Sequence, residues 1–195
     1  MEIINILLGM ALIVSMGGNM GGAKKGLRTS LTKVTDKPAT YLQKVPTTVS
    51  AIIFLLIAAG IFGVGSLDES KLSGFMPVRI AGLIIFSFFA WLQVFSFKSL
   101  KENYAPEILI QKEHELITGG IYRFIRHPQY VSQILSDLGA GLALMNFLVI
   151  PAVLLFELPL FYLRAKEEEK LLLKHFGDEF KAYKKRSGFF IPFIG

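Results

Sequence analysis

The chain has 195 residues, of which 52% are hydrophobic, and it carries a net charge of +6 with no cysteine. The lack of cysteine excludes disulfides, thiolate nucleophiles, iron–sulfur clusters and cysteine zinc sites. A basic chain can bind nucleic acid, but here the basic residues lie beside apolar blocks, where positive charge sets membrane topology. We therefore expect a membrane protein with no nucleic-acid partner.

Apolar blocks recur along the chain, and each is close to the ~20 residues that a helix needs to cross a bilayer. Because backbone polar groups must be satisfied within lipid, the blocks predict an all-α, polytopic membrane fold. A soluble helical protein is the alternative, but its core needs no apolar runs of this length. We predict five spans, with a tight turn at Asn146 between the last two: 3–22, 45–65, 78–97, 128–145 and 147–163.

The distribution of Lys and Arg predicts the orientation of these spans. The connection after the first span carries six such residues, the stretch 98–127 carries five, and the tail from Arg164 onward carries eight. The connection after the second span has one, and the turn at Asn146 has none. Since positive connections stay in the cytoplasm, we expect the N-terminus outside and the C-terminus in the cytoplasm.

The stretch 165–186 is typical of an amphipathic helix. Leu172, Phe176, Phe180 and Tyr183 recur at spacings of four, four and three, so they share one helical face. The pair at 177–178, Gly-Asp, predicts a helix end followed by a new cap. We divide the chain into a membrane region, 1–97, and a catalytic region, 98–195, that contains the hairpin 128–163 and this helix.

The sharpest local feature is the sequence GGIYRFIRHPQY at 119–130. Pro128 suits the first turn of a helix, and His127 before it should adopt an extended conformation. A helix N-terminus offers partial positive charge and free N–H donors, Arg126 adds a permanent cation, and Gly120 allows close backbone approach. These features describe an anion site at the membrane surface. The alternative is a capped interfacial helix whose Arg and His meet lipid headgroups.

Two groups of acids follow. Glu167 and Glu168 point about 100° apart on a helix, so one of them can face inward toward Arg126 or a ribose hydroxyl. The alternative is a solvated run in which Arg164 pairs with Glu168. Within the hairpin, an acid at 137 and another at 157 lie at similar depth; because ionised acids are costly there, we expect either a hydrogen-bonded pair or a functional role.

Other patterns are weaker. The three histidines, His114, His127 and His175, lack recognised metal-ligand spacing, so we expect no metal site. Gly17 and Gly21 fit the small-xxx-small pattern of packed membrane helices, which predicts a helix contact at the end of the first span.

Two motifs, GxYxxxRHPxY at 120–130 and EExxLxxxxFGxEFxxY at 167–183, resemble the signature of isoprenylcysteine carboxyl methyltransferases. They also resemble the related phospholipid N-methyltransferases. The two motifs occur in the family's order and are divided by a hydrophobic hairpin, and the resemblance covers about 112–187. The first three spans resemble no particular family.

The resemblance implies a membrane methyltransferase that uses S-adenosylmethionine, releases S-adenosylhomocysteine and encloses the cofactor on the cytoplasmic side. The implied acceptor is the carboxylate of a prenylated small molecule or protein C-terminus, reached through the membrane lipids. The residues implied to carry the reaction are Arg126, His127 and Glu167. The residues implied to form the cofactor pocket are His114, Leu116, Ile117, Gly119, Gly120, Tyr122, His127, Pro128, Tyr130, Arg164, Glu167 and Glu168.

The physics of methyl transfer is consistent with this reading. Transfer from a sulfonium to a carboxylate neutralises opposite charges, so a dry site that positions both groups needs no general base. Methylation of a lipid amine, the second hypothesis, would need a base such as His127. An NADPH-dependent membrane reductase and a membrane scaffold or channel are the remaining alternatives.

Overall fold

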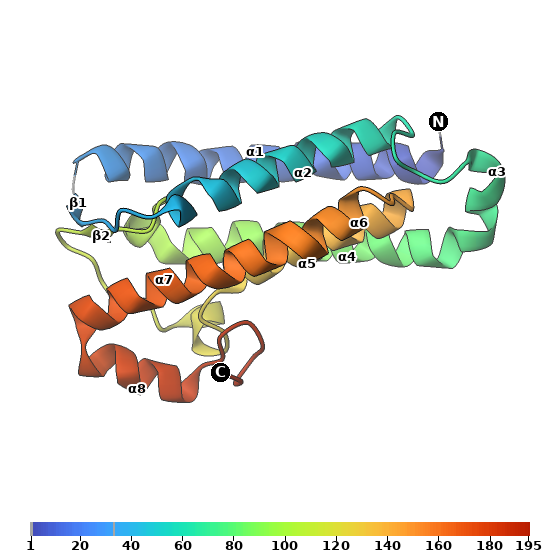
Figure 1. Cartoon of the computed structure of the whole chain (residues 1–195). Helices are drawn as coiled ribbons and strands as arrows, with labels where there is room; N and C mark the ends of the chain where they lie inside the picture. The colour runs from blue at the N-terminus through green and yellow to red at the C-terminus, as the bar shows by residue number, and fades with distance from the viewer. Residues whose placement is uncertain (1, 33) are drawn as a thin grey trace.

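The computed structural model describes residues 2–32 and 34–195 and consists mostly of helices, the long ones lying side by side (Figure 1). The helices are α1 (Ile3–Thr32), α2 (Val45–Ile61), α3 (Glu69–Leu72), α4 (Met76–Leu100), α5 (Pro128–Leu144), α6 (Val149–Ala152), a π-helical turn (Val153–Glu157), α7 (Leu158–Phe176) and α8 (Asp178–Arg186). Two short strands, β1 (Val34–Asp36) and β2 (Ile110–Gln111), pair antiparallel beside the end of α1.

Within the part of the chain that the structure describes, three helical segments are long and apolar enough to cross a membrane: Ile3–Met20, Tyr41–Ile61 and Met76–Leu100. They correspond to the first three predicted spans. The last two predicted spans are helical as well, but α5 has only 17 residues and the returning helix is divided into α6, the π turn and α7. The count of five spans therefore stays a prediction.

The turn predicted at Asn146 is confirmed, and its side chain explains the turn. The Asn146 Oδ1 atom accepts hydrogen bonds from the backbone N–H groups of Leu148 (2.9 Å) and Val149 (3.0 Å), which caps α6. Its Nδ2 atom donates to the carbonyl of Val64 (2.8 Å), so the turn is also bound to the end of α2. The break predicted at 177–178 is confirmed too, since α7 ends at Phe176 and α8 begins at Asp178.

Helices α4 and α5 touch through glycine. A Cβ atom added to Gly139 would lie 2.5 Å from the backbone nitrogen of Phe86, and one added to Gly82 would lie 2.7 Å from the Gly139 carbonyl oxygen. By contrast, a Cβ on Gly17 would meet nothing within 4 Å, whereas one on the neighbouring Gly18 would lie 3.0 Å from the Val94 side chain of α4. The surroundings of Gly21 lie outside the described residues.

The two acids of the hairpin are buried and hydrogen-bonded. The Gln133 amide donates to Asp137 Oδ2 (2.7 Å), and the Ser50 hydroxyl donates to Glu157 Oε1 (2.6 Å). The second oxygen of Glu157, Oε2, is buried with no hydrogen-bond partner among the described residues. Each acid is therefore held by a neutral neighbouring side chain, and the choice between a structural and a functional role for the two acids stays open.

Candidate functional site

A cleft lies where the start of α5, the end of α7, α8 and the loop before α5 come together. Its lining residues are Leu100, Asn103, Ala105, Glu107, Leu109, Ile110, His114, Glu115, Leu116, Ile117, Tyr122, Arg126, His127, Pro128, Gln129, Tyr130, Glu168, Leu171, Leu172, Phe180 and Tyr183. Most of the residues predicted for the site are therefore brought together. Four predicted residues are not among those that line it: Gly119, Gly120, Arg164 and Glu167.

Of the acids on α7, Glu168 lines the cleft, and the Tyr130 hydroxyl holds its carboxylate. The Tyr130 hydroxyl donates to Glu168 Oε2 (2.8 Å) and accepts a hydrogen bond from Arg164 Nε (3.1 Å). The ion pair considered between Arg164 and Glu168 is thus replaced by a bridge through a phenol. Tyr130 itself stacks between the rings of His127 (5.7 Å) and Phe161 (5.0 Å).

The guanidinium of Arg164 is buried against backbone carbonyls. It donates to Leu42 (2.7 Å), Gln43 (3.1 Å) and Pro106 (2.6 Å), which connects α7 to the segment before α2 and to the loop before α5. These acceptors are neutral, so they leave the positive charge of Arg164 in place beside Tyr130.

Glu167 is not among the residues that line the cleft, and its carboxylate pairs with Lys170 at 2.8 Å. Because neighbouring residues on a helix point about 100° apart, Glu168 faces the cleft while Glu169 turns toward the beginning of α5.

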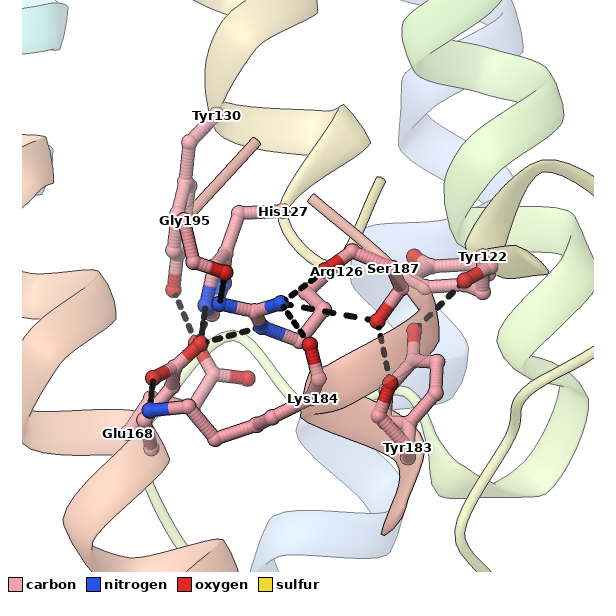
Figure 2. Close-up of polar contacts among 10 residues, drawn as sticks. Tyr122, Arg126, His127, Tyr130, Glu168, Tyr183, Lys184, Ser187 and Gly195 are labelled. Atoms are coloured by element: carbon pink, nitrogen blue, oxygen red, sulfur yellow. Dashed lines mark hydrogen bonds and ion pairs between the residues drawn. The ribbon is translucent and has the colours of Figure 1, made fainter. Parts of the chain in front are cut away.

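Arg126 occupies the centre of a buried polar cluster, shown in Figure 2. Its Nε atom donates to Glu169 Oε1 (2.6 Å), and its terminal nitrogens donate to the carbonyl oxygens of Ser187, Lys184 (3.3 Å) and Gly195 (2.9 Å). The cation predicted to bind an anionic ligand is therefore neutralised by Glu169. Its remaining donors hold the C-terminal segment 187–195 against the start of α5.

Glu169 is the junction of this cluster. Burial alone would raise the pKa of its carboxyl group, but the nearby His127 ring and the hydrogen-bonded cations Lys184 and Arg126 lower that pKa to about 2. Lys184 of α8 reaches the second carboxylate oxygen at 2.6 Å. The Glu169 carboxylate on α7 thus pairs with Arg126, just before α5, and with Lys184 on α8.

His127 precedes α5 with a non-helical backbone (φ −121°, ψ 53°), although its ψ differs from the extended conformation predicted. The ring is 5% exposed and packs edge-on against Phe189, with ring centroids 4.9 Å apart. Its Nδ1 atom lies 3.9 Å from Glu168 Oε2, and its Nε2 atom lies 3.4 Å from Glu169 Oε1 without a well-formed hydrogen bond. His127 is therefore a buried polar group at the wall of the cleft.

Several site residues were not assigned from the sequence. Phe180 and Tyr183 form the aromatic wall of the cleft, and the Tyr183 hydroxyl donates to the carbonyl of Tyr122 (2.7 Å). Burial raises the pKa of Tyr183 to about 12. The spacing of four, four and three places both aromatic residues on one helical face. That shared face is the feature of the sequence that could have assigned them to the site. Glu169 and Ser187 gave no comparable signal.

A second, apolar groove adjoins the cleft, and Pro128 lines both. It has a volume of about 510 Å³ and runs between α4, the start of α5 and the C-terminal segment. Its lining residues are Phe89, Leu92, Ile121, Phe124, Ile125, Pro128, Val131, Ser132, Leu135, Phe190, Ile191 and Pro192. A polar cleft and an apolar groove thus meet at the entrance of α5.

Comparisons with known proteins give one consistent result. The model of the isoprenylcysteine carboxyl methyltransferase (ICMT) family matches residues 81–174. Proteins named protein-S-isoprenylcysteine O-methyltransferase are similar: that of Tribolium castaneum is 39% identical over 92 residues, covering 47% of this chain and 33% of the relative. That of Homo sapiens is 31% identical over 119 residues, which cover 60% of this chain and 42% of the relative.

A solved structure of the eukaryotic intramembrane Ras methyltransferase ICMT matches with a TM-score of 0.61 and 25% identity, over 76% of this chain and 52% of that one. The resemblance inferred from the two motifs is confirmed. The chain spans about a third to two-fifths of the length of these curated relatives.

Proposed function

We propose that the chain is a membrane methyltransferase of the isoprenylcysteine carboxyl methyltransferase type, acting on a lipid-modified carboxylate; the match of that family's model to residues 81–174 supports this. The observation that carries the proposal is the meeting of the polar cleft with the apolar groove at Pro128. A methyl donor in the cleft and a lipid chain in the groove would bring the two reacting groups together at that point.

The cleft suits S-adenosylmethionine, which supplies an electrophilic methyl group on a sulfonium when bound. Glu168 has a partly exposed carboxylate that can accept hydrogen bonds from ribose hydroxyls. Leu116, Ile117 and Phe180 offer the apolar and aromatic surface that an adenine ring requires. Burial lowers the pKa of His114, which keeps that wall of the cleft uncharged near neutral pH.

The chain's contribution to the reaction is positioning and the exclusion of water. A carboxylate and a sulfonium lose their opposite charges on methyl transfer, so a dry site favours the step and no base is required. Arg126 is neutralised by Glu169, so we assign it and His127 to shaping the cleft. Arg164 keeps its charge, and we assign to it the attraction of the acceptor carboxylate toward Tyr130.

We further propose five membrane crossings, with α5 as the fourth and residues 147–163, from α6 into the first part of α7, as the fifth. The N-terminus would lie outside and the C-terminus in the cytoplasm. The cleft opens at the end of the helices that carries the basic connections, which supports this orientation. On this reading, residues 1–97 are chiefly membrane helices and residues 98–195 contain the catalytic region.

The test is to offer labelled S-adenosylmethionine to the purified protein together with a prenylcysteine analogue or with phosphatidylethanolamine. We expect base-labile label, as in a methyl ester, on the prenylcysteine analogue alone. Label on phosphatidylethanolamine alone would favour the lipid N-methyltransferase. Binding of NADPH without binding of S-adenosylmethionine would instead favour a reductase.

A further inference from the structure

A basic hollow lies outside the cleft, on the face where the loop before α5 meets the C-terminal segment. Thr118, Arg123, Arg186 and Phe193 line it, and its volume is about 490 Å³. Both arginines are exposed. The nearby Lys184 is paired with Glu169, whereas neither arginine forms an ion pair with any side chain that the structure describes.

The rim of this hollow is apolar. Phe193 is 67% exposed and Ile194 is 62% exposed, and the Phe193 ring packs edge-on against Phe124 at 5.6 Å. Figure 1 shows the C-terminal loop folded back alongside the helices, under the start of α5, rather than extending beyond their ends. The exposed rim therefore lies beside helices that face lipid.

The residues around the hollow indicate its level relative to the membrane helices. Phe124, which packs on Phe193, lines the apolar groove together with Ile191, and Phe89 and Leu92 of helix α4 line that groove as well. An apolar rim level with a membrane helix, directly beside two unpaired guanidinium groups, matches the boundary between acyl chains and headgroups.

We propose that this hollow binds the phosphate headgroup of an anionic membrane phospholipid. Arg123 and Arg186 supply two forked donors for one phosphate, a geometry that arginine forms better than lysine. Phe124, Ile191 and Phe193 then pack against the acyl chains. Basic pockets at the cytoplasmic membrane surface bind lipid headgroups in this way.

The lipid site is connected to the cleft by one segment of chain. Residues 187–195 carry the rim, and the same residues provide the carbonyls that bind Arg126 and the Phe189 ring that packs on His127. A bound lipid would therefore hold this segment against the wall of the cleft.

The test compares thermal stabilisation of the detergent-solubilised protein by short-chain phosphatidylglycerol, short-chain phosphatidylcholine and inorganic phosphate. We expect stabilisation by phosphatidylglycerol alone. In Arg123→Gln/Arg186→Gln its apparent affinity should fall about 30-fold, since each cation near the surface contributes a factor of about five. The matched control Lys98→Gln/Lys185→Gln removes two exposed charges outside the hollow and should keep the full effect.

Equal phosphatidylglycerol affinity in the Arg123→Gln/Arg186→Gln variant would overturn the proposal, as would full stabilisation by inorganic phosphate. A second measurement tests directly whether the rim lies near the lipid headgroups. Trp91 is the single tryptophan, so Phe193→Trp in a Trp91→Phe background reports only on this position. Lipids brominated near the headgroup should quench it strongly, and water-exposed, unquenched emission would contradict the proposal.

Discussion

The Tyr130 hydroxyl donates a hydrogen bond to Glu168 Oε2 at 2.8 Å. Tyr130 lies in the first turn of α5, and this bond orients a carboxylate that lies 38 residues further along the chain. The same hydroxyl accepts from Arg164, so the phenol transmits the position of a buried cation to the carboxylate in the cleft. The orientation of the Glu168 carboxylate therefore depends on the uncharged hydroxyl group of Tyr130, which lies between it and Arg164.

Replacing Tyr130 with phenylalanine keeps the ring stacked between His127 and Phe161 but removes both hydrogen bonds. We expect affinity for S-adenosylmethionine to fall about tenfold, the effect of losing roughly 1.4 kcal/mol of hydrogen bonding. Isothermal titration calorimetry measures this, and Tm should also fall, because the buried Arg164 Nε loses its acceptor. Unchanged affinity would mean that Glu168 does not need this partner.

The two neighbouring acids give a matched pair of variants. Glu168→Gln should weaken S-adenosylmethionine binding by at least about tenfold, because a carboxylate accepts hydroxyl hydrogen bonds more strongly than an amide does. Glu167→Gln removes an acid that pairs with Lys170 at the surface and should bind normally. The reverse order of effects would show that Glu167 is the cofactor ligand, as the sequence motif suggested.

The pKa of Glu169 predicts a pH dependence. Because its pKa lies at about 2, below the ordinary value of 4.5, the stability it contributes is present above pH 4.5 and is lost as the pH falls toward 2. We expect Glu169→Gln to lower Tm near pH 7, and the gap to wild type to narrow on acidification. Melting curves of both proteins between pH 3 and pH 7 check this. A gap independent of pH would exclude an ionised Glu169 as its source.

The α4–α5 contact predicts a steric effect. Gly139→Ala would force a Cβ atom against the Phe86 backbone nitrogen, which is 2.5 Å away, so backbone must move. We expect a loss of at least about 1–3 kcal/mol of stability. Gly17→Ala adds the same methyl group where nothing lies within 4 Å and should leave Tm nearly unchanged. Equal melting temperatures for both variants would contradict the close packing.

Much of the fold was predictable because its determinants are local. Apolar blocks indicated the helices, and the turn at Asn146 and the break at Gly177 follow from capping chemistry within a few residues. The glycine contact between α4 and α5 was not predictable, because it depends on which faces two distant helices present to each other.

The site was predictable in its residues but less so in its pairings. The two motifs indicated the cleft, and nine of the residues they implied line it. The partner of Arg126 was missed because Glu169 lies 43 residues away and the carbonyl of Ser187 lies 61 residues away. The choice between Glu167 and Glu168 depends on the rotation of α7 about its axis, which hydropathy does not specify.

The π-helical turn Val153–Glu157 has a consequence for that rotation. A π turn holds one residue more than an α turn. The turn at Val153–Glu157 therefore sets how far α7, with its acids, is rotated relative to the hairpin turn at Asn146. Deleting a single residue there would leave hydropathy and composition almost unchanged. It would nevertheless turn the following helix by about 100° relative to the preceding one, carrying Arg164 and Glu168 away from Tyr130. The number of residues between the two motifs is therefore as strict a requirement as the identity of any side chain within them.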